Sequence, residues 1–303
     1  MIFTVTCNPA LDCTLTAEEW QNGDRGVISP GGKGVNVSRL LTVLGVENLA
    51  LGFVAGENGR ALERALHKMG VDTDFIHLPA GETRVNVKIC GPTEIEKNGE
   101  GIPLTEEAPA QLERQLTDRV TAEDTVCLCG SLPPQTPADT YGRLVRHLHV
   151  SGVARIVVDT GGEPLLAALD AKPWLIKPNR DELVAAVGRE LPTVADVAQA
   201  AKELMERGAE NVLVSMGGEG ALLCTADGAV RHQPAPDGTV IGTVGAGDST
   251  VAGFITEYER TADWDAALRF GVVCGSATAF SDGLADAEMI EKVTACLPKS
   301  DRL

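Results

Sequence analysis

The order of hydrophobic and polar positions predicts alternating strands and helices over most of the chain. Short apolar runs recur, with helical patterns between them, at Thr125 to Cys129, Arg155 to Asp159, Trp174 to Lys177 and Asn211 to Ser215. Strands separated in this way by helices are typical of parallel βαβ units. The pattern therefore predicts an α/β fold with a doubly wound, mainly parallel sheet flanked by helices.

One predicted helix begins directly after a cluster of glycines. Residues 34 to 44 carry apolar side chains at the spacing of one buried helical face, namely Val37, Leu40, Leu41 and Leu44. The preceding residues read Gly31-Gly32-Lys33-Gly34. A glycine-rich turn is therefore expected at the N-terminus of this helix.

Two stretches, residues 12 to 29 and 83 to 102, do not follow this alternation. In the second, Val85, Val87 and Ile89 alternate with polar residues, which suggests antiparallel strands with one exposed face. We expect the two stretches to form a small β lid at one edge of the site. The chain has no internal repeat and no linker-like segment, so residues 1 to 303 are expected to form a single domain.

Composition narrows the range of partners and of cell compartments. With 26 basic and 43 acidic residues, the formal charge of −17 opposes binding to nucleic acid or to an anionic membrane. No apolar run is long enough to span a bilayer, and the chain starts without a secretory signal. The eight cysteines lie mostly among apolar neighbours, and the histidines are scattered. These features predict a reduced, cytoplasmic protein without a transition-metal site.

The most informative local pattern is Thr243-Val244-Gly245-Ala246-Gly247-Asp248, followed by an apolar helical run. Small residues let backbone N–H groups approach a ligand, and a helix N-terminus favours negative charge, so the Gly245-Ala246-Gly247 turn can hold a phosphoryl group. Asp248 could then accept the proton of an attacking hydroxyl. Alternatively, Asp248 only caps the helix.

The sequence does not match two other classes of glycine-rich loop. A P-loop needs Ser or Thr after Gly-Lys, but Gly34 follows Lys33. A dinucleotide-binding fingerprint needs glycine at its sixth place, but the motif that begins at Gly245 has Thr250 there. Both patterns fail, so a nicotinamide oxidoreductase is disfavoured.

A second group of candidates combines Asn8-Pro9-Ala10-Leu11-Asp12 with the glycine cluster at Gly32. Asp12 can hold sugar hydroxyls, while Lys33 and Asn36 supply hydrogen-bond donors. Equally, Asp12 can be an ordinary turn residue and Lys33 a solvated loop charge.

Two arginines, Arg84 and Arg25, are candidates for a phosphate clamp because guanidinium groups match phosphate oxygens. Taken singly, each is more often a solvated side chain.

Two further segments sit where strands end. In Lys177-Pro178-Asn179-Arg180-Asp181-Glu182, Asn179 and Glu182 have the offset of a capping box, and the same geometry could turn Glu182 toward a metal or phosphate through water. Ser215-Met216-Gly217-Gly218-Glu219-Gly220 could be a plain hairpin or a floor for nucleotide phosphates.

The combined motifs resemble one family along nearly the whole chain. Asn8 to Asp12, Gly31 to Val37, Gly130-Ser131-Leu132-Pro133, Lys177 to Glu182 and Thr243 to Asp248 occur in the order typical of PfkB (ribokinase-like) carbohydrate kinases. Within that family the chain looks most like the 1-phosphofructokinase branch, and close to the tagatose-6-phosphate kinases. The carrying segments are Thr83 to Lys88, Pro173 to Arg180 and Gly188 to Pro192.

The resemblance implies a ribokinase-like body with a small β lid that often makes a dimer contact. It implies that Asp248 is the general base and that the amides of Gly245, Ala246 and Gly247 form the anion hole. The sugar would be held by Asp12, Gly32, Lys33 and Asn36, and its phosphate by Arg84. ATP and Mg²⁺ would lie by Lys177, Asn179 and Glu182, with Glu182 acting on the metal through water, and the nucleotide along Ser215, Gly217, Gly218 and Gly220.

The expected reaction is transfer of the terminal phosphoryl group of MgATP to the 6-hydroxyl of fructose 1-phosphate. Tagatose 6-phosphate and fructose 6-phosphate remain alternative substrates, because pocket shape decides how a single hydroxyl is recognised. A non-catalytic sugar-phosphate sensor on the same fold is the alternative from another class, although a sensor has no need of a base beside an anion hole.

Overall fold

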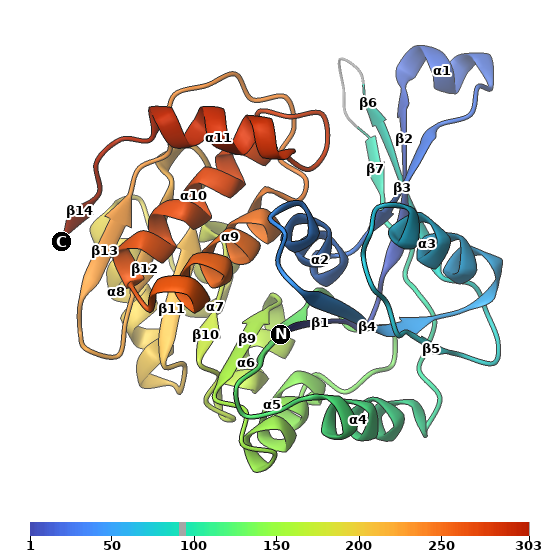
Figure 1. The fold of residues 1–303 in the computed structure, drawn as a ribbon, viewed down its shortest axis with the longest axis horizontal. Coiled ribbons are helices and arrows are strands. Elements are labelled where there is room, and N and C mark those ends of the chain that lie inside the picture. Colours follow the sequence, from blue (N-terminus) through green and yellow to red (C-terminus); the bar gives the residue numbers. More distant parts are fainter. Residues whose placement is uncertain (91–94, 303) are drawn as a thin grey trace.

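A twisted ten-stranded sheet forms the centre of the molecule (Figure 1). The computed structural model describes residues 1–90 and 95–302. The strands lie in the order β14 (Asp301–Arg302), β13 (Val230–Gln233), β12 (Ala221–Cys224), β11 (Asn211–Ser215), β10 (Leu175–Ile176), β9 (Arg155–Asp159), β8 (Thr125–Cys129), β1 (Ile2–Thr6), β4 (Asn48–Val54) and β5 (Ile76–His77). Pairing is parallel from β11 to β5 and antiparallel from β14 to β11.

Helices cover both faces of this sheet, which explains why central strands such as β8, β9 and β11 are mainly apolar. One face carries α2 (Lys33–Val43), α3 (Gly56–Lys68), α9 (Ala246–Thr261), α10 (Trp264–Ala279) and α11 (Ala287–Cys296). The other carries α4 (Ala108–Arg119), α5 (Thr140–Val150), α6 (Gly162–Leu169), α7 (Arg180–Val187) and α8 (Val194–Glu206). Within β8, Cys127 packs toward the first set and Val126 toward the second. A strand buried on both faces has no polar alternation to show.

The predicted fold class is confirmed, and most predicted elements lie where expected. The strands β8, β9 and β11 have the predicted bounds, whereas β10 is shorter than the predicted Trp174 to Lys177. The helix predicted over 34 to 44 is α2. No helix among the described residues combines the length and the apolar character needed to cross a membrane.

A second, small sheet projects from the body beside α2 and α3 (Figure 1). Its strands, in the order β3 (Val27–Gly31), β2 (Ala10–Thr16), β6 (Arg84–Cys90) and β7 (Ile95–Lys97), come from the two stretches that did not fit the α/β pattern. Residues 91–94 of the second stretch lie outside the described residues. We refer to these four strands as the small sheet.

The expectation of antiparallel strands in the small sheet is confirmed for two of its three strand pairs and wrong for the third. The outer pairs β3–β2 and β6–β7 are antiparallel, but β2 and β6 run parallel. Between β2 and β6 the chain returns to the body through α2, β4 and α3, so it can re-enter the small sheet in the same direction.

The first stretch also contains an unpredicted helix, α1 (Ala17–Asn22). Thr16 and Glu19 form a capping box at its start, and Gly23 ends it in the left-handed conformation. Both signals are present in the sequence, but the helix has only six residues and no buried side chain. It therefore lacks the periodicity on which helix prediction depends.

Candidate active site

Asp248 lies at the start of α9, in the first turn after the glycine-rich segment. The residue directly before the helix is Gly245, which has a left-handed φ of 80°, and no side chain caps this end of the helix. A residue with a Cβ is strained in that conformation. Asp248 accepts a hydrogen bond from Asn36 Nδ2 at 2.8 Å instead of capping the helix. The capping alternative for Asp248 is therefore wrong.

The carboxyl group of Asp248 is unusually hard to ionise. Its side chain is buried, and burial together with the charge of Asp159 raises its pKa to about 6, while the Asn36 hydrogen bond and the ammonium groups of Lys33 and Lys177 act in the opposite direction. A general base works best when its pKa lies near the operating pH. The position of Asp248 therefore suits proton abstraction.

The glycine turn offers backbone N–H groups at the N-terminus of α9. The Ala246 amide already donates to the Thr243 carbonyl at 3.2 Å. The amides of Gly245 and Gly247 would therefore carry more of the predicted anion hole than that of Ala246.

Two lysines and two further carboxylates surround this turn. Lys33, the first residue of α2, places its ammonium 2.8 Å from Asp159 Oδ1 and 3.2 Å from Glu182 Oε1. Lys177 Nζ lies 3.4 Å from the same Asp159 oxygen. Burial opposes the charge of Lys33, but the carboxylates of Asp159 and Glu182 outweigh it and raise its pKa. Lys33 is thus fixed by ion pairs and is not a solvated loop charge.

Asp159 was missed by the sequence analysis. It ends β9 at the carboxyl edge of the parallel strands, where α/β proteins bind ligands, and its side chain is fully buried. The run Arg155 to Asp159 was recognised only as a strand. Its acidic last residue is the signal that could have identified it.

The predicted capping box of Asn179 and Glu182 is present. Asn179 caps α7 and accepts from the Glu182 amide, and Glu182 Oε2 accepts from the Asn179 amide. The other Glu182 oxygen contacts Lys33, so this side chain both caps a helix and faces the site.

The segment Ser215 to Gly220 is brought to the same edge. Ser215 ends β11 and bridges to Asn179, and a 3-10 turn (Gly217–Glu219) leads into the antiparallel strand β12. The Arg180 guanidinium pairs with the Glu219 carboxylate across this turn. The segment is a hairpin between β11 and β12, as the first alternative predicted. The hairpin lies beside Asn179, one of the residues predicted to bind the nucleotide.

The small sheet contributes Asp12, which lies on β2. Asp12 Oδ1 accepts from Asn86 Nδ2 at 2.8 Å, and a Cβ on Gly31 would lie only 1.9 Å from Asp12 Oδ2. Arg39 connects this group to the body, because its Nη1 donates to Pro30 O and to Asn36 Oδ1. Arg39 and Asn36 of α2 therefore connect β3 of the small sheet with Asp248.

The two arginines differ in placement. Arg84 is half-buried on β6 and donates through Nε to Asn8 O and through Nη1 to Gly99 O. Arg25 is exposed in the segment between α1 and β3. Arg84 lies on the strand that pairs with the strand of Asp12, whereas no side-chain contact of Arg25 with the other candidate residues is seen among the described residues.

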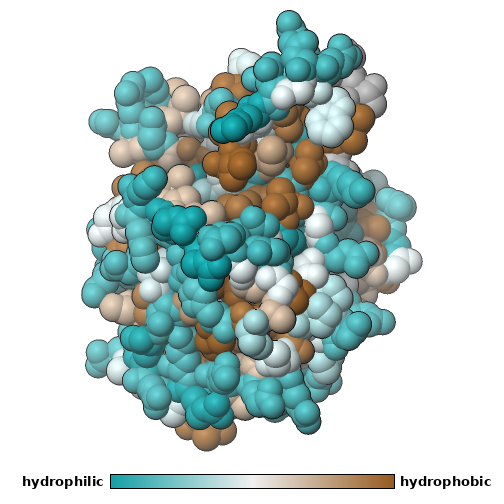
Figure 2. All heavy atoms as spheres, turned by 90° about the vertical axis from the view of Figure 1, so that its right-hand side faces the viewer, coloured by the Kyte–Doolittle hydropathy of each residue, from teal (hydrophilic) through white to brown (hydrophobic). Residues whose placement is uncertain are grey.

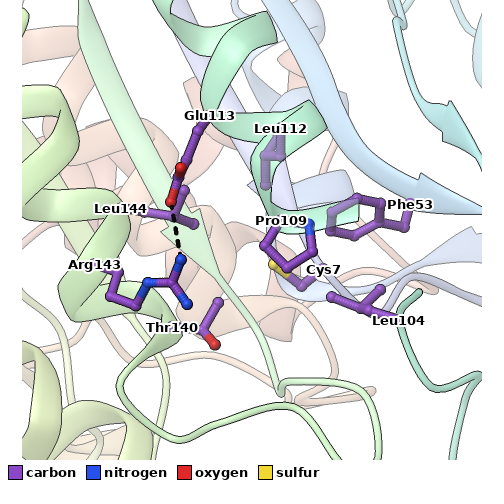
Figure 3. A pocket seen from close by; sticks show the side chains of 9 residues that line it. All are labelled: Cys7, Phe53, Leu104, Pro109, Leu112, Glu113, Thr140, Arg143 and Leu144. Carbon is purple, nitrogen blue, oxygen red and sulfur yellow. Dashed lines mark ion pairs between the residues drawn. The ribbon is translucent and has the colours of Figure 1, made fainter. Parts of the chain in front are cut away.

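A cavity of about 510 Å³ opens next to Lys33 and Glu182. Its walls include the segment Gly130-Ser131-Leu132-Pro133 after β8 and the segment Thr160-Gly161 after β9. A volume of this size accommodates a small-molecule substrate. Another cavity, lined by Cys7, Phe53 and Leu112 and shown in Figure 3, has only about 10 Å³, room for one water molecule at most.

Known proteins resemble this chain along its whole length. The model of the pfkB family carbohydrate kinases matches residues 6–290. A 1-phosphofructokinase of Bacillus subtilis is 40% identical over 298 residues, covering 97% of each chain, and one of Haloferax volcanii is 40% identical over 285 residues, covering 91% of this chain and 90% of its own. The crystal structure of phosphofructokinase-2 from Escherichia coli in complex with potassium superposes with a TM-score of 0.89 at 31% identity, covering 97% of this chain and 98% of that one.

The family resemblance predicted from the motifs is confirmed. The chain belongs to the pfkB family of carbohydrate kinases and is a phosphotransferase whose acceptor is an alcohol group.

Proposed function

We propose that the protein transfers the terminal phosphoryl group of ATP to the 6-hydroxyl of fructose 1-phosphate, giving fructose 1,6-bisphosphate and ADP. One observation of the structure supports the chemistry most directly: the buried Asp248 carboxyl lies beside the glycine turn at the N-terminus of α9, with its pKa raised to about 6. The choice of sugar rests on relatives named 1-phosphofructokinase.

Asp248 acts as the general base in this proposal. It accepts the proton as the 6-hydroxyl oxygen attacks the terminal phosphorus, the bond to the leaving oxygen breaks, and ADP departs. The helix N-terminus and the amides of Gly245, Ala246 and Gly247 stabilise the charge on the phosphoryl oxygens in transit. Lys33 and Lys177, which pair with the same Asp159 oxygen, add positive charge.

The sugar end is assigned to Asp12, Gly32, Lys33 and Asn36. Asp12 accepts from sugar hydroxyls, and Arg84 binds the phosphate already on the sugar. Two of the five guanidinium donors of Arg84 are used by Asn8 O and Gly99 O. These two bonds hold the guanidinium in place for a phosphate.

The nucleotide is assigned to Lys177, Asn179, Ser215, Gly217, Gly218, Gly220 and Gly247. Among residues 1–90 and 95–302 no cluster of three His, Cys, Asp or Glu side chains could hold a metal. Mg²⁺ usually arrives on nucleotide phosphates and keeps several waters. Glu182 would hold it through water, and the ion would neutralise charge on the phosphates.

We further propose that the small sheet is the lid of this site and the contact of a homodimer. Strand register places Asp12, Arg84 and Asn86 on one face and Cys13, Ile28, Val85 and Ile95 on the other. Ile28 and Ile95 are 62% and 55% exposed, and Figure 2 shows hydrophobic side chains gathered on the side of the molecule where the small sheet projects. A second copy would cover these side chains.

Light scattering tests the dimer. Ile28→Glu should lower the molar mass from that of two chains to that of one, while Lys68→Glu, a charge change at the end of α3, should not. A monomeric wild type, or a dimeric Ile28→Glu variant, would contradict the lid-mediated dimer.

A substrate panel tests the reaction. ADP release is measured with MgATP and fructose 1-phosphate, tagatose 6-phosphate, fructose 6-phosphate or unphosphorylated fructose, with Asp248→Asn as the blank. We expect the highest kcat/KM on fructose 1-phosphate. A different preferred sugar would change the substrate and keep the chemistry, whereas no turnover on any sugar would favour the sensor hypothesis.

A further inference from the structure

Asp159 joins parts of the site that come from different elements. It ends β9, its side chain is fully buried, and one oxygen, Oδ1, faces the ammonium groups of both Lys33 and Lys177 at 2.8 and 3.4 Å. Its other oxygen, Oδ2, is buried without a hydrogen-bond partner among the described residues. One carboxylate thus organises two cations that are far apart in the sequence.

The two lysines reach the same Asp159 oxygen from different elements. Lys33 starts α2, whereas Lys177 follows β10 and is only 2% exposed. A Cβ on Gly247 would lie 3.3 Å from Lys177 Nζ, so this ammonium sits directly against the N-terminus of α9. A cation there is unfavourable by itself, because a helix N-terminus carries partial positive charge. The buried Asp159 carboxylate compensates for it.

Lysine side chains are long and flexible, and an ammonium group needs a fixed partner to hold one geometry. We propose that Asp159 is a positioning residue, which holds the ammonium groups of Lys33 and Lys177 in place near the phosphoryl group in transit without touching the substrate. The inference rests on the proposed function, in which Asp248 is the base. It adds a residue that acts on this base and on the two lysines together.

The charge of Asp159 also reaches Asp248. Burial is the main reason for the raised pKa of Asp248, and Asp159 raises it further, while Lys33, Lys177 and the Asn36 hydrogen bond lower it. The thiol of Cys129 faces the same space and stays neutral, since burial raises its pKa well above the usual value. Removal of the Asp159 charge must therefore lower the pKa of Asp248.

The test compares Asp159→Asn with the wild type in kcat and in the pH dependence of kcat/KM. We expect kcat to fall roughly 10- to 100-fold, as for a displacement of catalytic groups by about 1 Å. The acid limb of kcat/KM should move to lower pH, because Asp248 loses a proton more easily. Ionisation of the sugar phosphate and of ATP is the same in both proteins, so the difference between the two limbs belongs to the enzyme.

Asp124→Asn is the matched control. Asp124 is also a largely buried aspartate paired with a cation, the N-terminal ammonium at 2.9 Å, but it precedes β8 at the opposite end of the strand from the site. The Asp124→Asn variant should be less stable than the wild type, but the acid limb of its kcat/KM profile should not move. A fall in kcat with an unmoved acid limb in Asp159→Asn would mean a structural role only and would overturn the proposal, as would a wild-type kcat.

If Asp159→Asn does not fold, Asp159→Glu gives the answer. It keeps the charge and displaces the carboxylate by one methylene, so kcat should fall while the acid limb stays near that of the wild type. A wild-type kcat would overturn the proposal. The proposed function and the positioning role can be refuted separately. Turnover by Asp248→Asn would refute Asp248 as the general base. An inactive Asp248→Asn together with wild-type kinetics of Asp159→Asn would refute only the positioning role.

Discussion

The two sides of the active site are built in different ways. On the body, Asp248, Asp159 and Lys177 are at least nine-tenths buried, in or next to elements that pack against both faces of the large sheet. On the small sheet, Asp12 and Asn86 are only partly buried, and the opposite face carries Ile28 and other exposed apolar side chains. The body can therefore hold catalytic groups rigidly, whereas the small sheet has fewer contacts to fix it.

This difference suggests a division of labour. A buried site keeps water away and strengthens electrostatic interactions, which suits the base and the charges around the phosphoryl group. A less densely packed element opens at a lower free-energy cost, which suits a part that must admit and release the sugar. Substitutions on the body should mainly change kcat, and substitutions on the small sheet should mainly change the KM of the sugar phosphate.

Asp248→Asn should have the largest effect of all. Asparagine keeps the shape of the side chain but cannot accept the proton, so we expect kcat to fall about 10³- to 10⁴-fold. Binding of ATP, measured by calorimetry, should stay within about threefold of the wild type, because the contacts proposed for ATP lie elsewhere. Near-normal turnover would refute the assignment of the base.

Substitutions in the body and in the small sheet should also differ in their effect on the free energy of unfolding. Leu40 in α2 is fully buried, and Leu40→Ala should cost about 3 kcal/mol. Ile28 on β3 is 62% exposed, and Ile28→Ala should cost less than about 1 kcal/mol in the monomer. Urea denaturation of both variants measures the contrast. Equal losses would show that the small sheet is as firmly packed as the body.

The same contrast explains what the sequence could and could not predict. The body was predictable because apolar runs and glycine turns mark buried strands and helix starts, as at β8 and α9. The small sheet was located by its alternation, but its parallel pair β2–β6 depends on where the chain re-enters after α3, and no local pattern records that.

Prediction of the active-site residues from the sequence was limited in the same way. The motif residues Asp248, Lys33, Asn36 and Glu182 were identified in advance, and the structure brings them together. Asp159 and Asn86 were not identified, since each acts through a partner that is distant in the sequence: Lys33 for Asp159 and Asp12 for Asn86. A single acidic or amide residue in a strand carries no sign of that partner.

Gly31→Ala should affect the sugar side selectively. A Cβ at this position would lie 1.9 Å from Asp12 Oδ2, so the carboxylate must move away. We expect the KM for the sugar phosphate to rise roughly 10- to 100-fold with little change in the KM for ATP. Gly242→Ala is the control, because a Cβ there meets no atom within 4 Å. An equal rise in both KM values would contradict the division between sugar and nucleotide sides.

Asn86→Ala should give the smallest effect of the series and the sharpest view of the small sheet. Asn86 donates to Asp12 Oδ1 and accepts from the Gly99 amide at 3.2 Å. It therefore connects Asp12, a proposed sugar ligand, with the segment that follows β7. Loss of one such hydrogen bond is worth about 0.5–1.5 kcal/mol, which corresponds to a KM increase of roughly 2- to 12-fold.

Lys88→Ala is the matched control for this variant, because Lys88 lies on the same strand and face, two residues farther from Asp12. Its KM should stay within about twofold of the wild type, since a substitution away from the site rarely costs more than ~0.5 kcal/mol. If kcat rather than KM fell in Asn86→Ala, the small sheet would take part in the chemical step. The contrast between a catalytic body and a recognising small sheet would then be wrong at this residue.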